Sequence, residues 1–486
     1  MSAQTRPTSN RRPVTSGTLI EDARLRERSS DTELDQEQEM PSSAMVEEER
    51  LRKRSSREDE GPLSRSSERV DVTQPEREQE RASREEAGKY SQQEEEYPSA
   101  EFFPPLSRIA TNIYTISYLI FFSFWGTLAR LGLHSLTFYP GAPITTGIIW
   151  ANVGGCVVMG YFAEDKKIFA QEWGHRSHEK ATPKHVAEEK AGDVLTDPAA
   201  ALKTHKAVKK TIPLYIGITT GFCGSFTSFS TYMSDTFLAL SNDLKNPNTT
   251  YIVHRNDGYS VMSCLAVMLY TVALSLGALY AGAHLSQAIS PFTPTIPFKF
   301  MRKVLDRVII FLAFGCWLGA VFLAIWPPDR NSHAARDGKE FWRGRAVFAL
   351  VFAPLGTLGR FYASLILNPI ISSFPLGTFL CNIFGSMVFG MCYDLQHVAG
   401  IGAKHVASKA GRNTRILTNC QVLQGVMDGF CGCLTTVSTW VAELQSLQLK
   451  YSYRYGITSI TAGLCSFIVI CGSLKWTKGF AEPVCS

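Results

Sequence analysis

The chain has 486 residues, of which 49 are Lys or Arg and 44 are Asp or Glu, giving a formal net charge of +5. This small excess is a sum over the whole chain and indicates no nucleic-acid partner. The apolar residues are spread unevenly, which argues against an array of soluble domains alone. Nothing apolar occurs near Met1, so we expect no secretory signal there.

Residues 1–100 are almost devoid of aromatic and branched apolar residues and are rich in Ser, Glu, Arg and Gln. Charges of both signs are interleaved, and such a segment cannot bury enough apolar surface to offset the entropy lost on ordering. We therefore expect 1–100 to be a disordered cytosolic tail. It serves either as a phosphorylation target or as a passive spacer, and the composition does not distinguish the two.

Segments long enough to cross a bilayer begin at about residue 105. A spanning helix needs about 20 apolar residues. Two candidates, 211–240 and 418–445, are too long for one straight span, so we expect each to be broken midway. Most of the 12 cysteines fall inside these segments, which favours small apolar packing over disulfides or a zinc site. The nine candidates are 113–136, 144–163, 211–240, 259–285, 308–326, 346–367, 376–395, 418–445 and 455–474.

The second half of the hydrophobic region repeats the first. Each copy holds four spans, with an arginine, an asparagine and a break rich in Gly, Ser and Thr in the same order. The arginines are 230 residues apart, as are the asparagines, and the breaks are 208 apart because the second copy has a shorter loop before its break. The matching elements are Arg130 and Arg360, Asn152 and Asn382, and the stretches GFCGSFTSFSTY (221–232) and GFCGCLTTVSTW (429–440).

One apolar segment, 308–326, has no counterpart in the other copy. Four spans return the chain to its starting side, so one additional span makes the second copy enter from the opposite side. The predicted fold is an all-α membrane protein with nine transmembrane helices. One linker helix joins two inverted four-helix repeats, and the third helix of each repeat is broken. The predicted domains are the tail at 1–100, a first repeat at 105–285, a linker at 286–345 and a second repeat at 346–477.

Charge supports this topology only in the first half. The basic loop 164–210 and the basic segment 299–307 indicate that these parts and the N-terminus are cytosolic. The glycosylation sequon at Asn248 then lies in an external loop, in agreement. The stretch 330–345 is also basic, although the span count places it outside. We give the span count more weight there.

The order of the motifs resembles the fluoride channel family over roughly 105–475. Gly-x-x-x-Arg comes first, then Asn-x-x-Gly, then Gly-Phe-Cys-Gly followed by Ser and Thr. Bacterial members are small four-span proteins that pair antiparallel, and the fused two-repeat fungal exporters are more similar to this chain. The resemblance implies a fluoride-selective channel that exports fluoride from the cytosol across the plasma membrane. It also implies a monomer acting as an internal pseudo-dimer, with fluoride and membrane lipid as its partners.

Fluoride is small and tightly hydrated, so a pore has to replace its water with hydrogen-bond donors. Amide and hydroxyl groups within the spans offer such donors, and the resemblance implies that the ring edge of Phe229 also contacts the anion. In the alternative reading, the hydroxyls bond back to their own helices, the asparagines join helices and the ring is core. The predicted fluoride pathway comprises Asn152, Asn382, Phe229, Tyr232, Ser230, Thr231, Ser438, Thr439, Tyr455 and Ser459.

The two copies differ at these positions, so we expect only one of two potential pores to conduct. The second copy has Val437 where the first has Phe229, and valine has no ring edge. The first copy has Leu274 where the second has Ser459, which interrupts its polar stripe. The conducting pore is then built from Phe229 of the first copy with Tyr455 and Ser459 of the second. Which asparagine lines it stays open.

The breaks free backbone carbonyls that lipid cannot satisfy, so these carbonyls have to line a cavity or bind an ion. By resemblance, four of them meet at a two-fold axis and hold a structural sodium ion, the only cofactor expected. The glycines would let the two backbones approach closely. Plain packing of small residues between crossing helices is the alternative. The predicted sodium ligands are the carbonyls of Gly224, Thr227, Gly432 and Thr435.

Arg130 and Arg360 are ionisable groups deep in their spans, which makes them candidates for function. We expect them to attract anions at a water-filled mouth, with snorkelling to the interface as the alternative. Asp428 replaces Thr220 just before the second break. It marks either a side that does not conduct or a helix end.

Export of fluoride needs only a passive pore, because the membrane potential supplies about 2.3 kcal/mol per charge per 100 mV. A fluoride/proton antiporter is the first alternative, and it should carry a relay of acidic residues or His within its spans. The acidic residues near the hydrophobic segments lie close to the segment ends, which favours a channel. A multi-pass membrane enzyme is the second alternative, but the sequence shows no cluster of catalytic or metal-ligating residues, so we expect no enzyme. The acidic residues concerned are Glu164, Asp235, Asp394 and Glu443.

Overall fold

The computed structural model describes residues 108–170, 208–245, 255–326, 341–403 and 414–485. Helices occur in these ranges on all nine predicted hydrophobic segments. The predicted tail and the sequon at Asn248 lie outside the described residues. The same holds for most of the basic loop 164–210 and most of the basic stretch 330–345.

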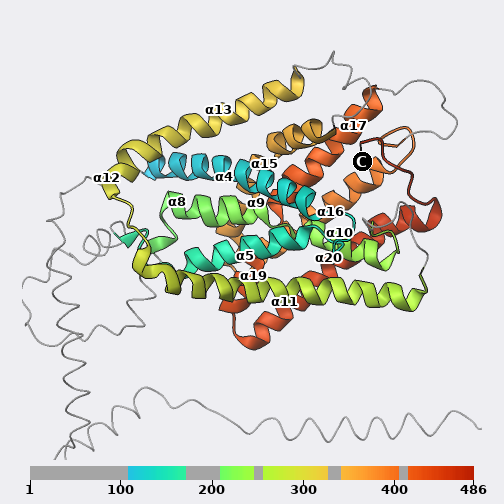
Figure 1. Cartoon of the computed structure of the whole chain (residues 1–486), viewed down its shortest axis with the longest axis horizontal. Helices are drawn as coiled ribbons and strands as arrows, with labels where there is room; N and C mark the ends of the chain where they lie inside the picture. Colours follow the sequence, from blue (N-terminus) through green and yellow to red (C-terminus); the bar gives the residue numbers. More distant parts are fainter. Residues whose placement is uncertain (1–107, 171–207, 246–254, 327–340, 404–413, 486) are drawn as a thin grey trace, which may run out of the picture. The chain divides into compact units, whose positions relative to one another are not determined.

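The helices fall into two sets, one from the first repeat and the linker and one from the second repeat, and most of them are labelled in Figure 1. The first set is α4 (Arg108–Thr137), α5 (Ile148–Glu164), α8 (Pro213–Ile216), α9 (Gly224–Phe226), α10 (Phe229–Leu240), α11 (Asp257–Ile289), α12 (Phe298–Phe300) and α13 (Asp306–Ile325). The second set is α15 (Phe341–Leu367), α16 (Leu376–Gln396), α17 (Thr414–Gly425), α18 (Gly432–Leu434), α19 (Ser438–Ser446) and α20 (Leu449–Thr477).

The described residues contain no β-strand, so the all-helical class is confirmed. Within the described ranges, six helical segments are long and apolar enough to cross a membrane. Helix α5 is apolar but shorter, and the two broken segments are divided into pieces. A crossing by all nine segments stays a prediction. The six are Arg108–Thr137, Asp257–Phe292, Phe298–Ile325, Arg345–Leu367, Leu376–Gln396 and Leu449–Thr477.

Both breaks lie where the sequence predicts them, and they have the same construction. A π-helical stretch, Gly217–Cys223 in the first repeat and Val426–Cys431 in the second, leads into one short helical turn. The backbone is then extended at Thr227 (φ −89°, ψ 152°) and Thr435 (φ −92°, ψ 147°) before a new helix begins. π-Helical turns are rare and are found mostly at functional sites. Each break therefore presents backbone groups that its own helix does not satisfy.

Corresponding helices pack in the same way within each repeat, because α5 lies along α11 and α16 lies along α20. The two repeats meet through the corresponding helices α4 and α15. Figure 1 shows α5 beside α11, and α13 beside α4. The half-helices that follow the breaks contact both repeats, because α10 packs on α16 and α20, and α19 packs on α5 and α11. The main buried cluster lies around these half-helices and includes Phe229, Tyr232, Trp440 and Tyr455.

A disulfide joins Cys420 of α17 to Cys485, which follows α20. The backbone N–H of Val484 donates to the carbonyl of Gly402 at 2.9 Å, so the segment after α20 is held on the connection between α16 and α17. The expectation that packing is favoured over disulfides does not hold for this pair. The physical reason is that a tertiary contact brings together two residues 65 positions apart. The other described cysteines are free.

Candidate functional site

The two breaks cap each other across the interface between the repeats. The hydroxyl oxygen of Thr227 accepts hydrogen bonds from the backbone N–H groups of Val437 (3.2 Å) and Ser438 (3.1 Å). The hydroxyl oxygen of Thr435 in turn accepts the N–H of Ser230 at 3.0 Å. Each threonine thus satisfies donors at the start of the other repeat's half-helix, which is the role of an N-cap residue. The interface is completed only when both repeats are present.

Asn152 and Asn382 occupy equivalent places at these helix starts. The Oδ1 atom of Asn152 accepts the N–H of Ser228 at 3.0 Å, and that of Asn382 accepts the N–H of Thr436 at 2.9 Å. Both side chains are fully buried. Their Nδ2 groups differ: that of Asn382 donates to the carbonyl of Thr436 at 3.3 Å, whereas that of Asn152 has no partner within the described part of the chain. The predicted donors are therefore buried at the breaks, and one of them is unpaired.

The ring of Phe229 is fully buried and meets aromatic rings from both repeats. It stands edge-on to Tyr232 (ring centroids 5.7 Å apart) and to Trp440 of the second repeat (5.5 Å). Its Cε1 edge reaches α20, because a Cβ added to Gly463 would lie 3.0 Å from it. The sequence predicted the meeting of Phe229 with α20. It did not predict the contact of Phe229 with Trp440, because the residue spacing within either copy gives no information on contacts between the copies.

The predicted hydroxyl residues of the breaks are all engaged in local or cross-repeat contacts. Ser230 contacts Thr435, with 3.0 Å between the hydroxyl oxygens. Ser438 donates to the carbonyl of Cys223 at 3.2 Å. The hydroxyls of Thr231 and Thr439 lie within 2.9 and 3.5 Å of the hydroxyls of Ser228 and Thr436, respectively. These groups form one continuous polar cluster at the crossing point of the breaks.

Glu443 of α19 is the centre of a polar group that the sequence did not predict. Its carboxylate accepts hydrogen bonds from the hydroxyls of Thr378 (2.6 Å) and Tyr455 (2.8 Å) and from Nδ2 of Asn368 (3.3 Å). The predicted pathway residue Tyr455 thus has its hydroxyl committed to a carboxylate. Ser459, one turn further along α20, donates to the carbonyl of Tyr455 at 2.7 Å. The only sequence signal for Glu443 was its place near the end of a span.

The two arginines cross between the repeats. Arg360 donates to the carbonyls of Cys433 (2.9 Å) and Thr220 (2.8 Å), and Arg130 donates to the carbonyl of Asp428. Both side chains are buried, with 1% and 3% of their surface exposed. In this structure the guanidinium groups satisfy carbonyls of the broken segments rather than facing water. Their role in attracting anions stays a prediction.

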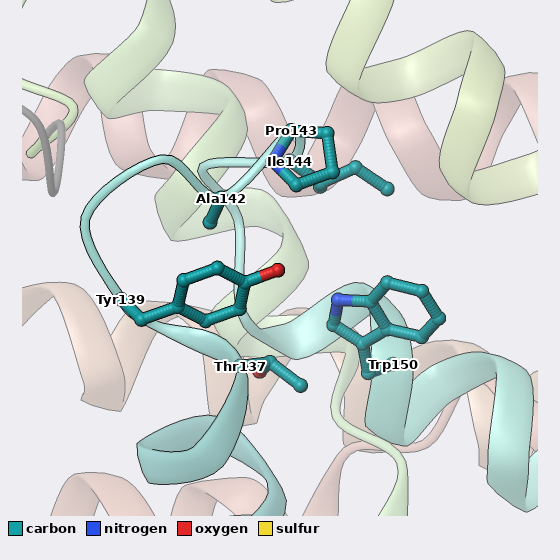
Figure 2. Close-up of a pocket in the computed structure, with 6 residues that line it drawn as sticks. All are labelled: Thr137, Tyr139, Ala142, Pro143, Ile144 and Trp150. Atoms are coloured by element: carbon teal, nitrogen blue, oxygen red, sulfur yellow. The ribbon is translucent and has the colours of Figure 1, made fainter.

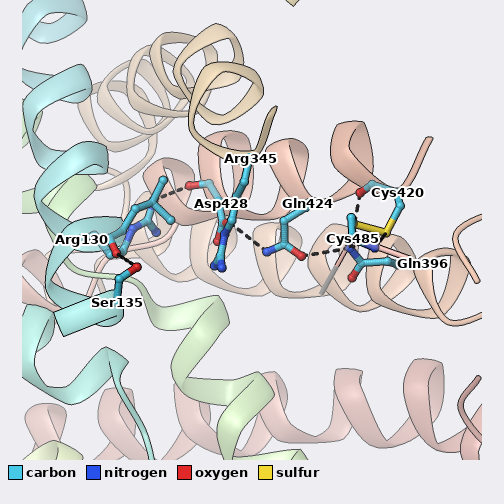
Figure 3. A network of polar contacts seen from close by, with 9 residues as sticks. Arg130, Ser135, Arg345, Gln396, Cys420, Gln424, Asp428 and Cys485 are labelled. Carbon is cyan, nitrogen blue, oxygen red and sulfur yellow. Dashed lines mark hydrogen bonds and ion pairs between the residues drawn. A yellow bond between two sulfur atoms is a disulfide. The ribbon is translucent and has the colours of Figure 1, made fainter. Parts of the chain in front are cut away.

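Asp428 belongs to a polar chain that runs from Arg130 to the disulfide (Figure 3). Arg345 forms an ion pair with its carboxylate at 2.6 Å, and Nε2 of Gln424 donates to the same oxygen at 2.9 Å. Gln396 links Gln424 to Cys420 and Cys485. The negative charge of Asp428 is therefore compensated. Arg345 belongs to the basic stretch 330–345 that was weighed for the topology, and here it is paired with Asp428.

The short helices α9 and α18, which carry Gly224 and Gly432 of the predicted sodium site and precede Thr227 and Thr435, pack on each other. Among the described residues, none of the hydrogen bonds that join the two repeats ends on the carbonyl oxygen of Gly224, Thr227, Gly432 or Thr435. Backbone oxygens suit a hard cation, so the ligand set fits. The charges oppose it, because the Arg360 guanidinium lies against Gly224 and that of Arg130 against Gly432. The ion stays a prediction.

A small pocket of about 150 Å³ lies at the connection between α4 and α5 (Figure 2). None of the predicted pathway residues lines it, and it carries no charged side chain. It is therefore not part of the candidate pathway. Its lining consists of Thr137, Tyr139, Ala142, Pro143, Ile144 and Trp150.

Comparison with known proteins assigns the chain to a family. A family model described as CrcB-like protein, Camphor Resistance (CrcB), matches residues 117–283 and 347–473. Fluoride export protein 1 of Neurospora crassa is 54% identical over 386 residues, which cover 78% of this chain and 70% of that protein. Fluoride export protein 1 of Candida albicans is 34% identical over 361 residues, covering 73% and 78%. The Fluoride-specific ion channel FluC of Pseudomonas aeruginosa is 32% identical over 142 residues, covering 28% and 98%.

No solved structure matches the chain. The family model matches twice, and its two matches include the two helix breaks, both arginines and both asparagines. The fungal relatives align over most of the chain, whereas the bacterial relative is covered almost whole by a stretch of 142 residues. The chain therefore belongs to the CrcB-like protein family.

Proposed function

We propose that this protein exports fluoride from the cytosol, and the names of its relatives, fluoride export protein and fluoride-specific ion channel, support this. The observation that carries the proposal is the pair of buried breaks, where Asn152, Asn382 and a cluster of hydroxyls gather within apolar helices. Such neutral donors can replace the water around a small anion without binding it too tightly for release. The proposal is transport and not catalysis.

The conducting pathway is built around α20, with Asn382 as its asparagine. Helices α16 and α20 lie side by side in the same direction, because Phe374 contacts Tyr455 and Gly390 contacts Cys471, 81 positions apart in both cases. The same offset brings Asn382 level with Gly463. The ring edge of Phe229 meets α20 at that glycine. The alternative is Asn152, which is favoured by its unpaired Nδ2 group.

The proposed topology has nine spans and inverted repeats. The protein lies in the plasma membrane, with its N-terminus in the cytosol. An odd number of spans puts the segment after α20 outside, together with the connection between α16 and α17. The disulfide Cys420–Cys485 joins these two parts and supports the orientation, since disulfides persist in oxidising compartments. The ion pair of Lys475 with Asp243 (2.5 Å) likewise joins two parts proposed to lie outside.

A passive channel is proposed rather than a fluoride/proton antiporter. Purified protein in liposomes loaded with potassium fluoride, read with a fluoride electrode, separates the two. A channel releases fluoride only when valinomycin lets potassium follow, because uncompensated anion flow builds an opposing potential. An antiporter releases fluoride along an imposed proton gradient without valinomycin. Absence of fluoride release under both conditions would refute export altogether.

A structural sodium ion, and a monomer that acts as an internal pseudo-dimer, complete the proposal. The packing of α9 on α18 and the backbone oxygens that the breaks offer support the ion, and the crossed threonine caps support the pseudo-dimer. Replacing sodium by a large organic cation throughout purification should lower both thermal stability and fluoride efflux, and adding sodium back should restore them. If neither thermal stability nor fluoride efflux changes, the protein has no structural sodium ion. Light scattering coupled to size exclusion tests the monomer.

A further inference from the structure

The indole of Trp440 in α19 carries a buried polar group for which the described residues supply no partner. Its side chain is fully buried, yet its indole Nε1–H has no hydrogen-bond partner among the residues that the structure describes. A buried donor left unsatisfied costs about 1–3 kcal/mol. Tryptophan therefore usually finds a partner for this group when it is buried. An unpaired indole N–H inside the candidate site calls for a ligand.

The corresponding position of the first repeat shows how such a group can be satisfied. Tyr232 holds that position, and its hydroxyl donates to the carbonyl of Met268 on α11 at 3.3 Å. Trp440 faces the equivalent helix of its own repeat, α20, but makes no such bond. The two repeats thus differ at this position in the availability of a donor.

The indole lies along the proposed pathway. A Cβ added to Gly456 would lie 4.0 Å from Cζ2 of Trp440, on the nitrogen-bearing side of the indole, and one added to Gly463 would lie 3.0 Å from the Phe229 ring. Ser459 lies between these glycines on the same face of α20. The two rings also meet edge-on at 5.5 Å. Trp440 and Phe229 therefore both lie against the face of α20 that carries Ser459.

We propose that the indole N–H of Trp440 is a hydrogen-bond donor to fluoride in transit and helps to select it over chloride. The inference rests on the proposed export function. Hydrogen bonds to an ionised acceptor are about twice as strong as neutral ones, and the small fluoride ion concentrates its charge most. The neighbouring hydroxyls of Tyr455 and Ser459 already donate to oxygens of the protein. The indole N–H is free to donate without breaking any such bond.

The test removes the N–H and keeps an aromatic side chain. Trp440→Phe does this by mutation, with a smaller ring. Replacement by 3-benzothienylalanine does it more closely, because sulfur takes the place of N–H in the same ring shape. Trp317→Phe is the matched control, since the Nε1–H of Trp317 donates to the carbonyl of Val351 at 3.0 Å, away from the pathway. Each protein is reconstituted after a monodisperse size-exclusion profile, and fluoride efflux and the chloride-to-fluoride permeability ratio are measured.

We expect both replacements at Trp440 to lower fluoride efflux at least about tenfold and to raise relative chloride permeability, while Trp317→Phe stays near wild type. Wild-type efflux and selectivity in the benzothienyl protein would overturn the role of the indole N–H and leave fluoride export standing. If Trp440→Phe does not fold, the benzothienyl protein decides, because it preserves the packing. If the wild-type protein itself moves no fluoride, the proposed function fails, and the inference falls with it.

Discussion

The guanidinium group of Arg360 lies directly against Gly224 of the other repeat. A Cβ added to Gly224 would lie only 2.5 Å from Cζ of Arg360, and the same relationship holds between Gly432 and Arg130. We expected these glycines to let two backbones approach closely. The group that approaches each glycine is instead an arginine side chain, which explains why a glycine and an arginine occur together in each copy.

Gly224→Ala should therefore destabilise the protein. The added methyl group forces the buried guanidinium of Arg360 away from the carbonyls of Cys433 and Thr220, at a cost of about 1–3 kcal/mol for overpacking and more for lost hydrogen bonds. Thermal unfolding of purified protein measures the effect. Gly132→Ala is the control, because nothing lies within 4 Å of a Cβ at that position. Equal melting temperatures for both variants would contradict the crossed packing.

Thr227→Val should be severe and Thr227→Ser mild. Valine keeps the shape but leaves the N–H groups of Val437 and Ser438 without their acceptor, at about 1–3 kcal/mol for each buried donor. Serine keeps the oxygen. Thr219→Val is the matched control, because the Thr219 hydroxyl only bonds back to the carbonyl of Tyr215. Melting temperature and efflux both report the change, and a tolerated Thr227→Val would mean that the crossed caps contribute nothing.

The asymmetry between the copies predicts a pattern in efflux. Phe229→Ile and Ser459→Ala should each greatly reduce fluoride efflux, because both residues face the proposed pathway on α20. Val437→Ile and Leu274→Ala change the corresponding positions of the other pathway and should have little effect. Initial rates per milligram of monodisperse protein in liposomes provide the measurement.

The two asparagines provide the control for this pattern. We expect Asn382→Ser to abolish most efflux and Asn152→Ser to be less severe, since both lose the same bond to a helix start and Asn382 is the asparagine proposed to line the pathway along α20. The reverse order would assign the pathway to Asn152. If each variant merely halves the rate, two equivalent pores exist and the single pathway is wrong.

Cys420→Ser or Cys485→Ser should lower stability by about 2–4 kcal/mol, because the disulfide constrains the unfolded chain over a separation of 65 residues. Cys465→Ser, which removes a free exposed cysteine, should not. In intact cells treated with an external reductant, a membrane-impermeant thiol reagent should label Cys420 and Cys485 in a protein whose other cysteines have been replaced. Labelling only after permeabilisation would place the pair in the cytosol and invert the proposed topology.

Sequence features that depend on local pattern predicted the structure well. A helix lies on each of the nine predicted apolar runs, and the small and hydroxylated residues in 221–232 and 429–440 located both breaks, because such residues favour interruption of an apolar helix. Three contacts between side chains of different helices were not predicted. The contact of Phe229 with Trp440, the bonds around Glu443 and the disulfide all join residues from different helices, and their spacing along the chain contains no signal of it.

The crossed arginines also set an order of events during synthesis. Arg360 meets Thr220, which precedes it by 140 residues, so one of its two acceptors is already in the membrane when it arrives. Arg130 instead bonds to the carbonyl of Asp428, 298 residues later. At about 5–20 residues per second, that partner follows after roughly 15–60 s. During this interval α4 carries a charged side chain whose final acceptor does not yet exist. Membrane insertion of the first repeat must therefore tolerate an arginine that only the second repeat can finally bury.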